Sequence, residues 1–110
     1  MIILALPDIV RNPSDQNGNI YSSIMLTCQI QGVPMPNITW LKDDNEIVDT
    51  SKYSVNLLGF SVLTLNNVTL SDEGKYKCKG ENPAGITYSS DATVYVYRKL
   101  CGHYDNDKSD

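Results

Sequence analysis

Few residues in this chain have side chains suited to chemistry, and the three cysteines are foremost among them. Cys28 and Cys78 lie in the body of the sequence, and Cys101 lies near its end, two residues before the single histidine, His103. Thiols can cross-link, bind a metal or act as nucleophiles. A metal site at Cys101 and His103 would need two more ligands of suitable type and spacing, and none is evident. We therefore expect no bound metal and no cofactor.

The other polar residues do not indicate catalysis. The serines have no nearby base, and no glycine-rich phosphate-binding loop is present. Asp43, Asp44, Glu46 and Asp49 surround one predicted turn, where carboxylates are typical of a solvated surface. A calcium site there would need ligands from the backbone and from a neighbouring domain. We predict that this chain is not an enzyme.

The elements that position these residues are predicted to be β-strands. Apolar and polar residues alternate in short runs separated by Gly, Pro, Asn and Asp, and no run keeps a helical period. The opening residues 1–6 are interpreted as an edge strand, and residues 11–19 as a polar connector with a turn at Asn17-Gly18. Strands are also expected at 53–55 and, briefly, at 47–48. Inward-facing positions in the remaining strands are Ile24, Leu26, Cys28, Ile30, Ile38, Trp40, Leu63, Leu65, Tyr76, Cys78, Ala92, Val94 and Val96.

Several residues together resemble the immunoglobulin superfamily, and more closely its I-set branch, as found in ectodomains of receptor tyrosine kinases and cell-adhesion proteins. The matching residues are Cys28, Trp40, Leu63, Asp72, Gly74, Tyr76, Cys78, Asn82 and Gly85. The resemblance implies an all-β fold, an immunoglobulin-like Greek-key β-sandwich of two antiparallel sheets. It implies a domain over residues 1–97. Residues 98–110 are interpreted as a polar tail, a linker or the start of a truncated neighbouring module.

The resemblance also implies structural roles for its residues. Cys28 and Cys78 would form a disulfide between the two sheets beneath Trp40, and the Tyr76 hydroxyl would bind backbone near Asp72. Asp72 would also pair with a base before the fourth strand of the family, here Lys52. Two reduced, buried thiols, as in cytosolic relatives of this fold, are the alternative. The expected core signature is Trp40, Leu63, Asp72, Gly74 and Tyr76.

Three features bear on localisation. The expected disulfide requires an oxidising compartment, and Asn37-Ile38-Thr39 and Asn67-Val68-Thr69 are both N-glycosylation acceptors by sequence. Together they favour an extracellular location, either secreted or as the ectodomain of a membrane protein. No apolar run is long enough to span a bilayer, so we expect no direct membrane insertion of this segment. Cys101 would then pair with a cysteine in a neighbouring module, link two chains or remain free.

Composition and resemblance together define the expected function. The chain has 110 residues and a net charge of −4, which gives a nucleic-acid partner no electrostatic support. The resemblance implies a non-enzymatic protein-interaction module, one domain of a cell-surface receptor or adhesion protein. It would act by surface complementarity or as a tandem spacer, with partners that include homophilic contacts and neighbouring immunoglobulin domains. The alternative is a structural I-set domain of a giant intracellular muscle or cytoskeletal protein.

One sheet face is a candidate interaction surface. Three lysines alternate with buried residues before and after Cys78, and three tyrosines are predicted on the last strand. They form either a solvated face or an electrostatic docking face for an acidic partner, with aromatic anchors or edge packing beside it. The six residues are Lys75, Lys77, Lys79, Tyr88, Tyr95 and Tyr97.

Overall fold

The structure is a computed structural model that describes residues 3–47, 52–57, 59–100 and 103–105. These residues form strands and one short 3-10 helix. The elements are β1 (Ala5–Arg11), β2 (Gln16–Asn19), β3 (Ile24–Val33), β4 (Asn37–Lys42), β5 (Asn45–Glu46), β6 (Lys52–Leu57), β7 (Phe60–Leu65), η1 (Leu70–Asp72), β8 (Gly74–Asn82), β9 (Gly85–Tyr88), β10 (Ala92–Leu100) and β11 (His103–Asp105).

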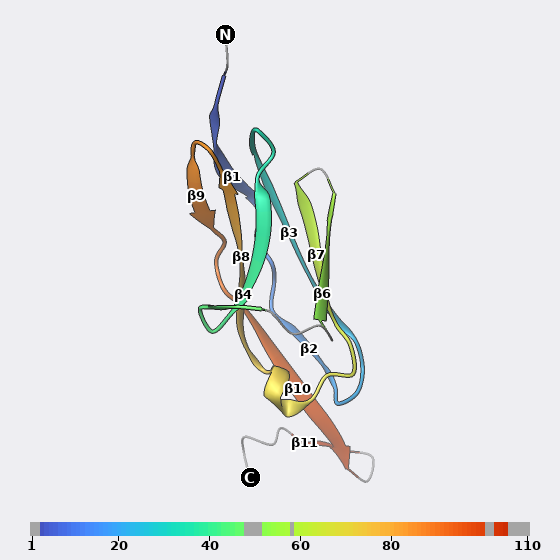
Figure 1. The fold of residues 1–110 in the computed structure, drawn as a ribbon. Helices are drawn as coiled ribbons and strands as arrows, with labels where there is room; N and C mark the ends of the chain where they lie inside the picture. The colour runs from blue at the N-terminus through green and yellow to red at the C-terminus, as the bar shows by residue number, and fades with distance from the viewer. Residues whose placement is uncertain (1–2, 48–51, 58, 101–102, 106–110) are drawn as a thin grey trace.

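The strands form two sheets that face each other. One sheet has the order β1-β3-β7-β6, and the other has the order β11-β10-β8-β4-β5, with β2 added beside β10 and β9 beside β8. Figure 1 shows the two layers along the molecule, with β1 beginning at one end and η1 and β11 at the other. The predicted all-β sandwich of two sheets is therefore confirmed.

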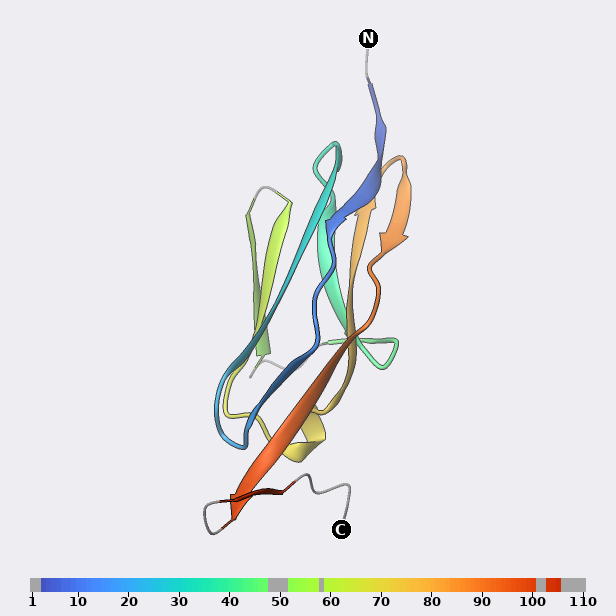
Figure 2. The same ribbon diagram turned by 180° about the vertical axis from the view of Figure 1, so that it is seen from behind.

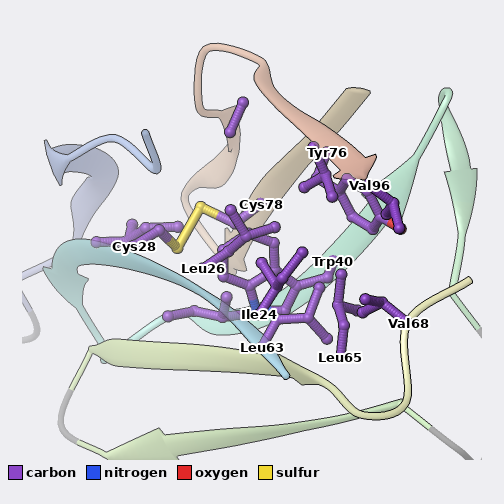
Figure 3. Packing of buried hydrophobic residues seen from close by; sticks show 14 residues of the cluster. Ile24, Leu26, Cys28, Trp40, Leu63, Leu65, Val68, Tyr76, Cys78 and Val96 are labelled. Carbon is purple, nitrogen blue, oxygen red and sulfur yellow. A yellow bond between two sulfur atoms is a disulfide. The ribbon is translucent and has the colours of Figure 1, made fainter. Parts of the chain in front are cut away.

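The core lies between the sheets and follows the predicted alternation. Along β3, the side chains of Ile24, Leu26, Cys28 and Ile30 are buried, and the residues between them are not. This period of two places one face of each strand against the opposite sheet. Figure 3 shows the resulting cluster around the disulfide and the indole of Trp40.

The N-terminal segment differs from the prediction. The edge strand runs from Ala5 to Arg11 rather than over residues 1–6, and it pairs with β3. The predicted connector contains β2, whose Asn17 lies opposite Tyr95 in a parallel pairing with β10. Figure 2 shows β2 alongside β10. Asn and Gly have low strand propensity, so local sequence alone favoured a turn, and pairing with β10 prevailed.

The C-terminal strands also differ in detail. The predicted last strand is divided into β9, which pairs with β8, and β10, so Tyr88 lies on β9 rather than beside Tyr95. β10 continues through Leu100 and pairs with β11, so regular structure extends past residue 97.

The short strand opposite β4 also lies earlier than predicted. It is β5, at Asn45–Glu46 rather than at 47–48. Ile47 adds one backbone hydrogen bond to Trp40, and Val48 lies outside the described residues. The predicted strand at 53–55 is confirmed within β6.

Candidate interaction surface

A disulfide joins the two sheets at the centre of the core. Cys28 of β3 and Cys78 of β8 are bonded, and both are fully buried. Trp40 lies opposite Cys78 on β4, and its Nε1–H donates to Ser61 Oγ at 2.8 Å. Ser61 is itself fully buried and lies opposite Cys28 in the β3–β7 ladder. The bridge and the indole therefore form one unit with a satisfied polar contact.

Ser61 was not among the predicted core residues, although a signal for it was present. Leu63 and Leu65 are predicted to face inward, and position 61 shares their phase on a strand. Leu63 is 2% exposed and lies with Ser61 and Leu65 on the inner face of β7. A small hydroxyl side chain in that phase provides the acceptor that a buried indole N–H requires.

The predicted tyrosine contact is present at the end where η1 lies. Tyr76 is 1% exposed, and its hydroxyl donates to the backbone oxygen of Asp72 at 2.6 Å. Burial, followed by the charges of Asp72 and Asp43, raises the pKa of Tyr76 well above its usual range. The phenol therefore remains protonated and acts as a donor that holds the loop before β8 against the sandwich.

Asp72, the last residue of η1, also caps the start of this short helix. Its Oδ2 accepts the backbone N–H of Thr69 at 2.8 Å, which forms part of a capping box at η1. The side chain of Lys52, its predicted partner, lies outside the described residues. Gly74 follows at the start of β8, where an added Cβ would lie 2.9 Å from a carboxylate oxygen of Asp43. This close approach explains why a glycine suits that position.

Asn82 organises the turn between β8 and β9. Its Oδ1 accepts the backbone N–H groups of Ala84 and Gly85 at 2.9 and 3.2 Å. Its Nδ2 donates to the backbone oxygens of Ala5 and Pro34 at 2.8 and 3.0 Å. One side chain thus ties β1, the β3–β4 loop and the β8–β9 turn together at this end of the molecule.

Two of the three lysines on β8 are partly neutralised within the domain. Lys77 Nζ lies 2.7 Å from Asp44 Oδ1 and 5.1 Å from the ring centre of Tyr88. The hydrogen bond within this ion pair is the largest cause of two shifts: it lowers the pKa of Asp44 and raises the pKa of Lys77. Lys79 lies 3.9 Å from Glu81.

The remaining members of the face occupy different places. Lys75 is exposed, and its backbone N–H donates to Asp43 Oδ1 at 3.0 Å. Tyr88 is 50% exposed on β9, whereas Tyr95 and Tyr97 lie on β10. Tyr97 lines a surface hollow with residues of β2. The structure therefore brings Tyr88 to the lysines and places Tyr95 and Tyr97 along the β2–β10 pairing.

Both acceptor asparagines are exposed. Asn37 is the first residue of β4, and Asn67 lies between β7 and η1. These positions are near opposite ends of the sandwich, as Figure 1 shows for the elements that carry them. The broad faces of the sheets therefore lie between the two acceptor positions.

Among the described residues, no group of three or more His, Cys, Asp or Glu side chains is arranged to hold a metal ion. Within the same ranges, no helix has the length and apolar character to cross a membrane. Cys101 lies outside the described residues, as does the side chain of His103.

The sandwich architecture, the inter-sheet disulfide with its tryptophan and the tyrosine contact define an immunoglobulin-like domain. A model of the immunoglobulin I-set domain matches residues 7–96. The chain therefore belongs to the I-set family, as its resemblance implied.

The curated relatives that the chain matches are much longer proteins. The chain is 38% identical to rat vascular endothelial growth factor receptor 1 over 87 residues, 79% of this chain and 6% of the receptor. It is 32% identical to the mouse peroxidasin homolog, covering 80% of this chain and 6% of that protein. It is 34% identical to human hemicentin-1, covering 74% of this chain and 2% of that protein. The chain thus spans a small fraction of each relative.

Solved structures confirm the fold. A titin M10–obscurin-like 1 immunoglobulin complex matches with a TM-score of 0.82 and 23% identity, covering 88% of this chain and 99% of that chain. A mutated variant of titin domains I67–I69 matches with a TM-score of 0.81 and 27% identity, covering 87% of this chain and 34% of that chain.

Proposed function

We propose that this chain is a non-enzymatic, extracellular protein-interaction module, one I-set domain of a cell-surface receptor or adhesion protein. The observation that carries the proposal is the buried Cys28–Cys78 disulfide, because such a bond forms and persists in oxidising compartments. The exposure of both acceptor asparagines, Asn37 and Asn67, adds support. So does the similarity to a growth factor receptor.

The proposed contact surface is the outer face of β8 and β9. Lys77 and Lys79 each have an acidic partner within the domain, which reduces the net positive charge of the face. Tyrosine is enriched at the centre of protein–protein contacts and charged residues lie at their polar rim, so the exposed Tyr88 beside these paired charges fits such a contact. This mixed face fits a polar protein surface better than a uniformly acidic one, so the contact would act by complementarity rather than by long-range attraction.

Peptide mapping of the protein isolated from its native source tests the extracellular assignment. Digestion without reduction is expected to recover Cys28 and Cys78 in one cross-linked peptide pair, and Asn37 or Asn67 in glycopeptides. Blocking free thiols during lysis prevents oxidation after extraction. Recovery of both cysteines as alkylated free thiols, without glycan on either asparagine, would overturn the proposal and favour an intracellular structural domain.

A further inference from the structure

Tyr21 occupies a backbone position that its side chain does not favour. It lies in the turn between β2 and β3, where Ser22 N–H donates to the backbone oxygen of Asn19 at 3.1 Å. Its φ is 69°, a value that turns of this kind usually assign to Gly or Asn. A bulky residue at positive φ is a genuine outlier, and such strain is retained at sites where it serves a purpose.

The ring of Tyr21 gains little from packing within the domain. Tyr21 is 69% exposed, the most exposed of the large apolar and aromatic residues that the structure describes. The preceding residue, Ile20, packs against the core instead. The strained backbone therefore presents an aromatic ring to the surroundings of the domain rather than burying it.

The neighbour of this turn is the acceptor asparagine Asn67. Tyr21 N–H donates to the backbone oxygen of Val68 at 2.6 Å, and Val68 N–H donates to the backbone oxygen of Ser22 at 3.0 Å. The side chains of Ser23 and Asn66 meet at 3.2 Å. These contacts extend the β3–β7 ladder beyond its last pair, Ile24 and Leu65.

Tyr21 and Asn67 are therefore neighbours across two adjoining turns. Asn67 also has positive φ, 49°, and is exposed. Asn67 is one position before Val68, the residue that pairs with Tyr21, so a regular ladder would place the two side chains on opposite faces. The left-handed backbone at both residues breaks this alternation: Val68 is fully buried, whereas Tyr21 and Asn67 are both exposed. Two exposed residues with left-handed backbone conformations are thus held side by side by hydrogen bonds between their turns.

We propose that an N-linked glycan on Asn67 packs its first N-acetylglucosamine against the ring of Tyr21. The attachment forms a bond between Asn67 Nδ2 and the sugar's anomeric carbon and breaks the bond from that carbon to the pyrophosphate oxygen of the lipid-linked donor. The lipid pyrophosphate is the leaving group, and the amide nitrogen gives up one proton. A pyranose ring has an apolar face of C–H groups, and an aromatic face is its natural partner. The contact would cover the exposed ring and stabilise the end of the sandwich that carries Val68 and η1. This inference rests on the proposed extracellular function.

The test uses the chain secreted from animal cells with Asn37→Gln, so that Asn67 is the single remaining predicted acceptor. An endoglycosidase trims the glycan to one N-acetylglucosamine, and bacterially produced, oxidised chain supplies the sugar-free form. Both forms are prepared with Tyr21, with Tyr21→Phe and with Tyr21→Ala. The phenylalanine variant keeps the ring, and the alanine variant removes the ring while retaining an L-residue at the same φ. Tyr88→Ala is the matched control, because it deletes an exposed tyrosine on β9.

The sugar is expected to raise the thermal midpoint by about 4 °C in the Tyr21, Tyr21→Phe and Tyr88→Ala forms. In Tyr21→Ala the rise should fall below about 1 °C. Proton NMR supplies an independent measurement, since ring currents should move the sugar's C–H and N-acetyl signals upfield. That displacement should vanish in Tyr21→Ala and persist in Tyr88→Ala.

The outcomes separate this inference from the proposed function. If Asn67 is glycosylated but Tyr21→Ala changes neither the midpoint gain nor the sugar signals, the packing is refuted and the extracellular assignment stands. If Asn67 carries no glycan after secretion, the packing is refuted as well. The extracellular assignment is then decided by the native-source peptide map, through the disulfide and Asn37.

Discussion

Replacing Ser61 with alanine would leave the indole N–H of Trp40 without its acceptor. Ser61 is fully buried and Trp40 is 3% exposed, so solvent has little access to replace the hydroxyl. A buried donor left unsatisfied costs about 1–3 kcal/mol. The cavity from one lost oxygen atom adds little to this cost. We therefore expect Ser61→Ala to lower the free energy of unfolding by about 2 kcal/mol.

Urea unfolding followed by tryptophan fluorescence measures this cost. Trp40 is the single tryptophan of the chain and lies in the core, so its emission reports on the folded state. Ser14→Ala is the control, because Ser14 is exposed and the loss of its hydroxyl should change the free energy of unfolding by less than about 0.5 kcal/mol.

A double-mutant cycle then isolates the contact from the packing. Trp40→Phe removes the donor, so in that background Ser61→Ala should cost less than about 0.5 kcal/mol, giving a coupling energy of about 1.5 kcal/mol. Circular dichroism replaces fluorescence for the two variants that lack the indole. An equal cost of Ser61→Ala in both backgrounds would show that the hydrogen bond does not account for the effect.

Three further perturbations follow from the same core. Replacing Cys28 and Cys78 together by alanine should lower the free energy of unfolding in urea by about 4 kcal/mol, since the bridge spans 50 residues; a loss under about 1 kcal/mol would contradict the assignment of stability to the cross-link. Burial raises the pKa of Tyr76, so the unfolded chain releases its phenolic proton first, and stability should fall as the pH rises above about 10. Tyr76→Phe should lose about 1–3 kcal/mol at neutral pH and show a shallower alkaline decline in thermal scans, whereas parallel declines would argue against this linkage. Gly59 has φ 83°, and an added Cβ would collide with a backbone oxygen of β3, so Gly59→Ala should cost about 2 kcal/mol or more in the same urea assay; a neutral result would refute the strain argument.

The fold could be predicted because its central residues are constrained by several requirements at once. Cys28, Trp40 and Cys78 share the inward phase of their strands, and Tyr76 lies two residues before a cysteine, where its hydroxyl reaches the loop behind it. Each residue type satisfies both the strand period and a chemical need, so few alternative arrangements accommodate all of them. This consistency carried the prediction of the two-sheet architecture.

The displaced elements lacked such local signals. The parallel pairing of β2 with β10 depends on contacts between residues that are nearly eighty positions apart in the chain. One example is Asp15, just before β2, whose side chain accepts the N–H of Thr93 at 2.7 Å. Ser89 likewise separates β9 from β10, with its hydroxyl accepting the backbone N–H of Cys78 at 2.9 Å. Propensity and turn chemistry describe neighbours in the chain, so these long-range backbone contacts could not be read from them.

Ser61 and Tyr21 show two different limits of sequence interpretation. The inward position of Ser61 follows from the period of its strand, and only its role as an acceptor required the structure. The conformation of Tyr21 follows from no period, since a left-handed backbone at a tyrosine is contrary to the local preference of that residue. Buried residues are constrained by the fold and can be inferred from its pattern, whereas a surface residue that departs from its local preference is visible only in the backbone. In a family whose shared fold serves many partners, surface residues that depart from their local backbone preference are where the individual function of one domain should be sought.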